Sequence, residues 1–123
     1  MTETNGYPNQ RRYPRLAVAV KVEGYWWDLE GGRRKLNALM TMVSEGGVQL
    51  RSNELVPANA KVEFGVKLGS LRKFEVRGLV RWWRRNGEIR DLGVEFEAPV
   101  RRLGAFVEKE LVPGAGKGQA PAA

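Results

Sequence analysis

The sequence predicts an all-β fold, a six-stranded antiparallel β-barrel followed by one C-terminal α-helix. Apolar and polar residues alternate along most of the chain, which is the pattern of strands that bury one face. Glycine-rich turn signals separate the alternating segments, and only one segment has the spacing of an amphipathic helix. A closed sheet is favoured because closure removes the unpaired edges that a small open sheet exposes.

The first half of the chain contains three predicted strands. The first is predicted from apolar residues at every second position, namely Leu16, Val18, Val20 and Val22. Two more strands are expected near residues 36–43 and 46–51. Glu30-Gly31-Gly32 predicts the turn before the first of these two, and Gly46-Gly47 predicts the corner between them.

The second half contains three further strands. Residues 62–68 alternate, and a long strand follows from Phe74 to Arg85. Asn86-Gly87 then predicts a tight hairpin, because both residues tolerate the positive φ that a type I′ turn needs. The return strand runs from about Ile89 to Phe96.

A helix is predicted from Pro99 to Leu111. Proline suits the first helical turn, where its missing N–H leaves no hydrogen bond unmade. One stripe of the helix is apolar and includes Val100, Leu103, Val107 and Leu111, with Phe106 beside it. We expect this stripe to pack on the barrel or to close one of its ends.

Two Trp pairs occur, Trp26-Trp27 and Trp82-Trp83. Adjacent residues of a strand point to opposite faces, so one ring of each pair should be buried. The alternation places Trp82 inside and Trp83 outside. The outer rings are expected to pack under the helix or to stack on arginines, the alternative being a partner or ligand surface.

The composition predicts three segments of the chain and excludes several classes of metal and catalytic site. Residues 1–10 are expected to be a disordered arm, 11–111 the barrel domain and 112–123 a flexible tail. There is no cysteine and no histidine, which removes thiolate metal sites and the commonest general base. The acidic residues form no evident acid–base pair, so neither an enzyme nor a metal cofactor is expected. A cytoplasmic location is expected, because no apolar run approaches the ~18 residues of a membrane span and the first ten residues are polar.

The chain is basic, with 21 Lys and Arg against 14 Asp and Glu. Fourteen of the basic residues are arginine, whose planar fork matches phosphates and guanine edges. The excess indicates a phosphate-bearing partner or a solvated basic surface. The runs Arg33-Arg34-Lys35 and Arg84-Arg85 flank turns and are expected to be solvated, the less favoured alternative being a phosphate-binding role.

Two segments could carry binding chemistry. In the first, Arg11, Arg12 and Arg15 surround Tyr13-Pro14 just before the first strand, in a stretch that the proline keeps non-helical. This segment is either a ligand-binding arm or a basic leader. The second is Ser44-Glu45-Gly46-Gly47, in which backbone N–H groups and a hydroxyl could bind an anion, although an ordinary turn would have the same sequence.

Together the two segments resemble the PilZ domain, the bacterial receptor module for cyclic di-GMP. That family has Arg-x-x-x-Arg before its first strand, matched by Arg11 and Arg15, and later Asp/Asn-x-Ser-x-x-Gly, matched by Ser44 and Gly47. Leu92-Gly93-Val94-Glu95-Phe96 is also typical. The resemblance covers roughly residues 11–111 and implies a six-stranded barrel with a C-terminal helix.

One position departs from the family pattern. Met42 stands where the family has Asp or Asn, and a thioether cannot make the hydrogen bonds of a carboxylate or amide. The loss of such a bond costs about 1–3 kcal/mol, which leaves a weaker binder or a member that has abandoned the ligand. We expect Met42 to face the ligand groove; the alternative is an inward apolar row of Leu36, Ala38, Met40 and Met42.

The resemblance implies a non-enzymatic cyclic di-GMP receptor whose arginine arm becomes ordered on the ligand and which signals to an unknown protein partner. The implied ligand-binding residues are Arg11, Arg12, Arg15, Ser44, Gly46 and Gly47, with Met42 and Gly93 as further candidates. The first alternative is a PilZ-type adaptor that does not bind the nucleotide. The second, less favoured, is a basic barrel that binds single-stranded nucleic acid through arginine and tryptophan.

Overall fold

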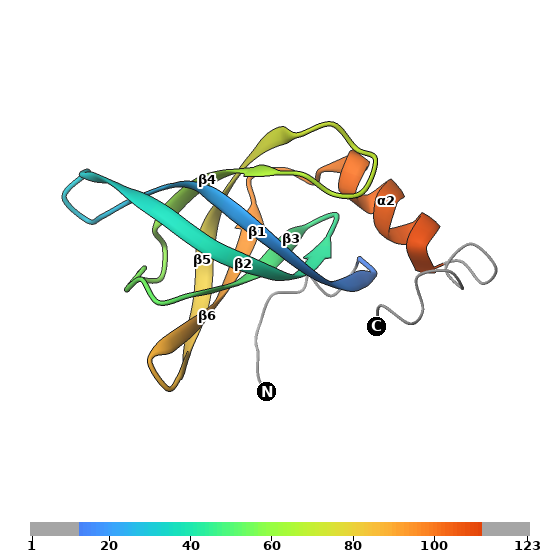
Figure 1. Ribbon diagram of the computed structural model, residues 1–123. Helices are drawn as coiled ribbons and strands as arrows, with labels where there is room; N and C mark the ends of the chain where they lie inside the picture. The colour runs from blue at the N-terminus through green and yellow to red at the C-terminus, as the bar shows by residue number, and fades with distance from the viewer. Residues whose placement is uncertain (1–12, 112–123) are drawn as a thin grey trace.

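A computed structural model describes residues 13–111, which form six strands and one helix (Figure 1). The elements are β1 (Arg15–Trp27), β2 (Arg33–Ser44), β3 (Gly47–Ser52), β4 (Lys61–Val66), β5 (Phe74–Asn86), β6 (Ile89–Phe96) and α2 (Arg101–Leu111). All neighbouring strands are antiparallel, and the sheet closes in the order β1–β2–β3–β6–β5–β4. The predicted barrel and helix are therefore confirmed. The predicted arm and tail, with Arg11 and Arg12, lie outside the described residues.

The barrel encloses one apolar core. Its largest fully buried side chains are Leu36, Met40, Leu50, Phe64, Leu92 and Leu103. The helix contributes Leu103 and Val107, which confirms that its apolar stripe packs on the barrel. Leu111 is 48% exposed, so the buried stripe ends one turn earlier than predicted.

Three strands contain irregularities in their pairing. Register shifts occur between Ala17 and Val20 in β1, between Met40 and Met42 in β2, and between Val80 and Trp82 in β5. A bulge inserts one extra residue, so the residues beyond it exchange faces of the sheet. The predicted alternation of β1 still holds, because Leu16, Val18 and Val20 pack against the core and Val22 is buried. In β2 and β5 the residues beyond the bulge lie on the faces opposite to those that an unbroken alternation predicts.

Trp82 shows the effect of a bulge most clearly. Val80 pairs with Val94 in the core, but the extra residue Arg81 makes Trp82 the partner of Gly93. Leu92 and Val94 are both fully buried, so Gly93, between them, faces outward, and so does Trp82. The prediction that Trp82 points into the barrel is wrong, because the bulge at Arg81 reverses the alternation.

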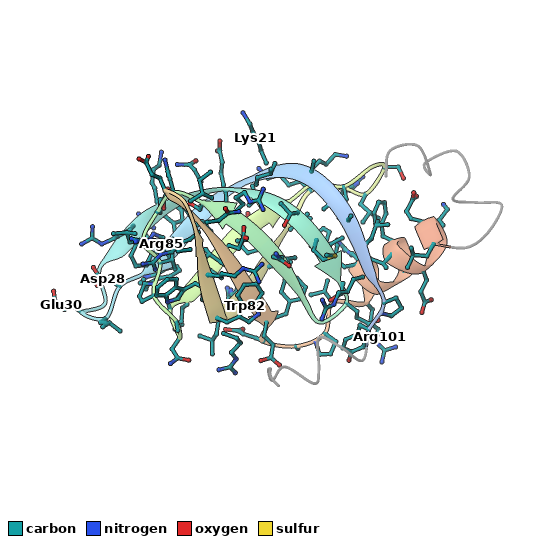
Figure 2. The ribbon with its side chains drawn as sticks, turned by 90° about the horizontal axis from the view of Figure 1, so that it is seen from below. Lys21, Asp28, Glu30, Trp82, Arg85 and Arg101 are labelled. Carbon is teal, nitrogen blue, oxygen red and sulfur yellow. The ribbon has the colours of Figure 1, made fainter. Side chains whose placement is uncertain are left out.

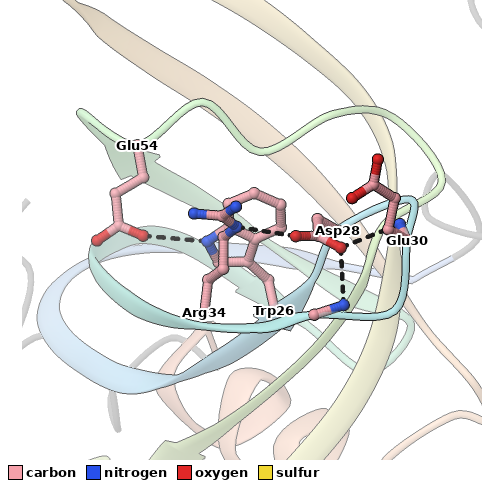
Figure 3. Close-up of polar contacts among 6 residues, drawn as sticks. Trp26, Asp28, Glu30, Arg34 and Glu54 are labelled. Atoms are coloured by element: carbon pink, nitrogen blue, oxygen red, sulfur yellow. Dashed lines mark hydrogen bonds and ion pairs between the residues drawn. The ribbon is translucent and has the colours of Figure 1, made fainter.

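The β1–β2 turn is organised by Asp28 (Figure 3). Its carboxylate accepts the N–H of Gly32 at 2.7 Å, the N–H of Glu30 at 3.0 Å and the Arg34 Nε–H at 3.0 Å. Gly31 has a φ of 86°, a left-handed conformation that glycine adopts at no steric cost. The hydrogen bond from Gly32, followed by the contact with Arg34, lowers the pKa of Asp28 below its ordinary value of 3.8.

Replacing Asp28 by alanine is expected to destabilise the domain at neutral pH and to have little effect in acid. The lowered pKa means that the carboxylate stabilises the fold fully above its unfolded-state pKa, and that this contribution disappears as the pH falls through the folded-state pKa. Urea unfolding of both proteins at about pH 7 and about pH 2 measures the difference. Equal destabilisation at both pH values would contradict a role for the charged carboxylate.

The helix begins on the β2–β3 turn. The N–H of Val100 donates to the carbonyl of Glu45 at 2.8 Å, and the N–H of Phe96 donates to the carbonyl of Gly46 at 2.9 Å. Arg101, at the start of α2, and the turn residues Asp28 and Glu30 lie at opposite ends of the barrel (Figure 2). The β2–β3 turn thus holds both the last strand and the helix at one end of the molecule.

Candidate functional site

The two predicted motifs meet at the start of β1. Arg15 is the first residue of β1, and its Cα is paired with that of Ser44, the last residue of β2. The Arg15 side chain is exposed, whereas Ser44 is buried. Antiparallel pairing therefore brings the end of the arginine segment next to the Ser-x-x-Gly turn, although 29 positions separate the two residues in the sequence.

Ser44 closes the β2–β3 turn. Its hydroxyl accepts the N–H groups of Gly46 and Gly47, both at 3.2 Å, and donates to the carbonyl of Gly47 at 3.2 Å. Such a local side-chain bond replaces the backbone bonds that a tight turn cannot make. The hydroxyl of Ser44 and the N–H groups of Gly46 and Gly47, which were predicted as anion-binding groups, thus bond to one another within the turn. Ser44 contributes directly to the shape of the turn.

A row of residues crosses the outer face of the barrel from this end. Cross-strand pairing joins, in order, Ala17, Met42, Gln49, Gly93 and Trp82. Met40 and Val43 are fully buried, whereas Met42 is half-buried, because the β2 bulge lies between Met40 and Met42. Met42 is therefore on the outer face and is no part of an inward apolar row.

Trp82 covers Gly93 at the far end of this row. A Cβ atom added to Gly93 would overlap the indole ring of Trp82. Glycine at position 93 therefore lets the ring lie against the backbone of β6, where it remains half-exposed. Gly93 is a candidate that the sequence predicts, whereas the outward position of Trp82 is not predictable from the alternation, because the alternation does not reveal the bulge.

A family model for the PilZ domain matches residues 9–109. The chain belongs to the PilZ domain family. Among solved structures it is similar to the Bacillus subtilis inhibitor of motility, MotI/DgrA, with a TM-score of 0.65 and 17% sequence identity. The similarity covers 81% of this chain and 50% of the other, so the PilZ domain described here spans about half the length of that protein and shares its fold. No curated protein matches the chain.

PilZ domains are non-enzymatic receptor or adaptor domains, and the ligand of the receptors is cyclic di-GMP. Within residues 13–111, this PilZ domain contains no group of three or more acidic side chains that could hold a metal ion. Its helix α2 is too short to cross a bilayer, and the described residues contain no other helix.

The arginines at the other end of this PilZ domain have local partners. The Arg33 guanidinium lies 4.3 Å from the centre of the Tyr25 ring, and Arg34 contacts both Asp28 and the ring of Trp26. Trp26 is itself buried and donates its Nε1–H to Glu54 at 3.2 Å (Figure 3). These contacts support a structural role for Arg33 and Arg34.

Trp83 has an arginine neighbour as well. Its ring is 42% exposed, and the Arg90 guanidinium lies 3.7 Å from the ring centre. Trp83 lies on the face of β5 opposite to Trp82 and pairs with the fully buried Leu92, so its predicted outward placement is wrong for the same reason as that of Trp82. The outer ring of this pair is Trp82, and the Arg84 guanidinium lies 5.6 Å from its centre, in agreement with the expectation that an outer ring stacks on an arginine.

Proposed function

We propose that this PilZ domain is a cytoplasmic receptor for cyclic di-GMP, bound on the outer face of the barrel beside Arg15. The pairing of Arg15 with Ser44 carries the proposal, because it places the end of the arginine segment beside the Ser-x-x-Gly turn that resembles the family motif. From that end, the row runs through Met42 and Gln49 to Trp82, whose indole ring covers Gly93 and gives an aromatic surface on which a guanine base can lie.

The arginines supply the polar recognition in this proposal. Arg11 and Arg15 engage guanine edges and phosphates, with Arg12 assisting, because a guanidinium fork makes two parallel hydrogen bonds to either group. Binding orders the arm against the barrel and creates a surface for a protein partner. The turn of Ser44, Gly46 and Gly47 sets the position of Arg15 through the β1–β2 pairing.

Isothermal titration calorimetry of the purified domain with cyclic di-GMP tests the proposal. We expect saturable binding of the cyclic dinucleotide and much weaker binding of GMP, which cannot span both motifs. A change in tryptophan fluorescence should accompany binding, because Trp82 lies on the proposed face. The absence of heat and of any fluorescence change at high micromolar ligand would contradict the proposal.

A second candidate is a PilZ adaptor that contacts a protein partner without the nucleotide. Two observations favour it: Met42 brings no hydrogen-bonding group to the outer face, and the N–H groups of Gly46 and Gly47 are used within the turn. An absence of cyclic di-GMP binding would support this candidate. Affinity for oligonucleotides that grows with their length and falls with salt would instead indicate nucleic-acid binding.

Replacing Met42 by aspartate is expected to tighten cyclic di-GMP binding about fivefold, which corresponds to about 1 kcal/mol for one added hydrogen bond. The melting temperature should change little, because Met42 is half-buried on the outer face. Calorimetry and thermal unfolding of the same variant measure both effects, and Met42→Leu is the apolar control. A large drop in melting temperature with unchanged affinity would contradict this assignment of position 42.

A further inference from the structure

A second row of charged residues lies beside the row that ends at Trp82. Asp91 of β6 is paired with Arg51 of β3 on one side and with Arg84 of β5 on the other. Arg51 is two positions from Gln49 in β3, Asp91 is two positions from Gly93 in β6, and Arg84 is two positions from Trp82 in β5, so the two rows share the same outer face. Residues two apart in a strand are separated by about 7 Å, so the two rows are neighbours.

Asp91 holds both arginines. Its carboxylate, only 4% exposed, accepts the Nε–H of Arg51 at 2.9 Å and lies 3.6 Å from the Nη2 of Arg84. The hydrogen bond that Arg51 donates to Asp91 also raises the pKa of Arg51, because it stabilises the charged guanidinium. A buried carboxylate needs such partners, because burying it alone would be costly.

The arginines themselves remain accessible. Their side chains are 42% exposed for Arg51 and 67% exposed for Arg84. The bond from Arg51 uses its Nε–H, and a guanidinium fork carries four further N–H donors on its two terminal nitrogens. Asp91 thus fixes the base of the Arg51 fork, while the end of the fork can still bind an anion.

We propose that Arg51 and Arg84, positioned by Asp91, bind a phosphate of cyclic di-GMP on this face. This inference rests on the proposed function and adds a phosphate-binding pair that the PilZ motifs of this sequence do not contain. Two forks from two strands suit a phosphate, whose non-bridging oxygens accept from both, whereas one fork already fills the O6 and N7 edge of a guanine. Arg15 stands at one end of the face and this pair at the other, and the ligand lies over the row between them.

The test compares Arg51→Gln, Arg84→Gln and the double variant with Arg77→Gln by calorimetry with cyclic di-GMP. Arg77 is a matched control, because it is on β5, is also 67% exposed and also pairs with a carboxylate, that of Glu63 at 3.0 Å. Each single variant should weaken binding about fivefold and the double variant about 25-fold, whereas the control should stay within about twofold. Phosphorus NMR of the ligand should show a smaller shift on binding to the double variant.

Asp91→Asn separates positioning from net charge. The substitution makes the face more positive, so diffuse attraction alone predicts tighter binding, whereas loss of the positioned forks predicts weaker binding. We expect binding about threefold weaker, with a folded domain verified by circular dichroism. Tighter binding would overturn the role of Asp91.

The outcomes also separate this inference from the proposed function. Binding by the unmodified domain with unchanged affinity in the double variant overturns the phosphate pair and leaves the receptor proposal standing. Weaker binding with an unchanged phosphorus shift overturns the phosphate assignment in favour of a base contact. An unmodified domain that does not bind cyclic di-GMP contradicts the receptor proposal itself, and the inference with it.

Discussion

Replacing Gly24 by alanine is expected to lower the free energy of unfolding by about 3 kcal/mol. Gly24 lies where the barrel closes, paired with Phe64 of β4. An added Cβ atom would overlap the carbonyl oxygen of Glu63 and lie 2.5 Å from the Cα of Phe64, and both of these atoms belong to the backbone. A side chain could rotate away from such a contact, but two paired strands can only move apart.

The control for this prediction is Gly31→Ala. Gly31 has open space around it, so alanine there causes only the backbone strain of a left-handed φ, about 1 kcal/mol. Urea unfolding of both variants gives the two free energies directly. Equal losses for Gly24→Ala and Gly31→Ala would show that close approach at the β1–β4 junction does not limit stability.

Replacing Arg15 by alanine is expected to weaken cyclic di-GMP binding by about 30-fold, or about 2 kcal/mol, the value of a charge-assisted contact. Arg15 is exposed but anchored, because its backbone is part of β1 and is paired with Ser44. Arg33 is also exposed, but it lies at the other end of the barrel, over the ring of Tyr25. Arg33→Ala should therefore leave the affinity within about twofold.

Calorimetry of the two variants at the same ionic strength measures this contrast. Each variant removes one positive charge, so a purely diffuse attraction would reduce both affinities equally. Such an equal reduction would argue against a site at Arg15 and for general electrostatics. The fold should be unaffected in both, and thermal unfolding verifies this.

Much of the fold follows from patterns that a reader of the sequence can see. The predicted turns near Gly31, Gly46 and Gly87 all lie between strands, and Gly31 and Gly87 have positive φ. The type I′ turn predicted at Asn86-Gly87 is wrong, because Asn86 is the last residue of β5, pairs with Ile89 and does not have a positive φ, so that the loop consists of Gly87 and Glu88. Alternation identified each strand but assumed that it never changes phase. It failed at Trp82 because a bulge depends on pairing with the neighbouring strand, which one strand's own sequence does not specify.

The candidate site divides in the same way. Arg15 and Ser44 could be predicted because each belongs to a short local motif. Arg51, Arg84 and Asp91 could not, because Arg51 and Asp91 are 40 positions apart and only the order β3–β6–β5 brings the three together. A site whose residues are brought together by the register of three strands can be identified only from the structure of the sheet.

The attachment of Phe96 and Val100 to the β2–β3 turn makes that turn observable without any label. Their amide hydrogens are bonded to the carbonyls of Gly46 and Glu45, so each can exchange with deuterium only when that bond opens. Slower exchange at these two amides would report that the turn beside Ser44 has become more rigid. Because these two hydrogen bonds join the turn to the end of β6 and the start of α2, a more rigid turn would also restrict the motion of these two segments.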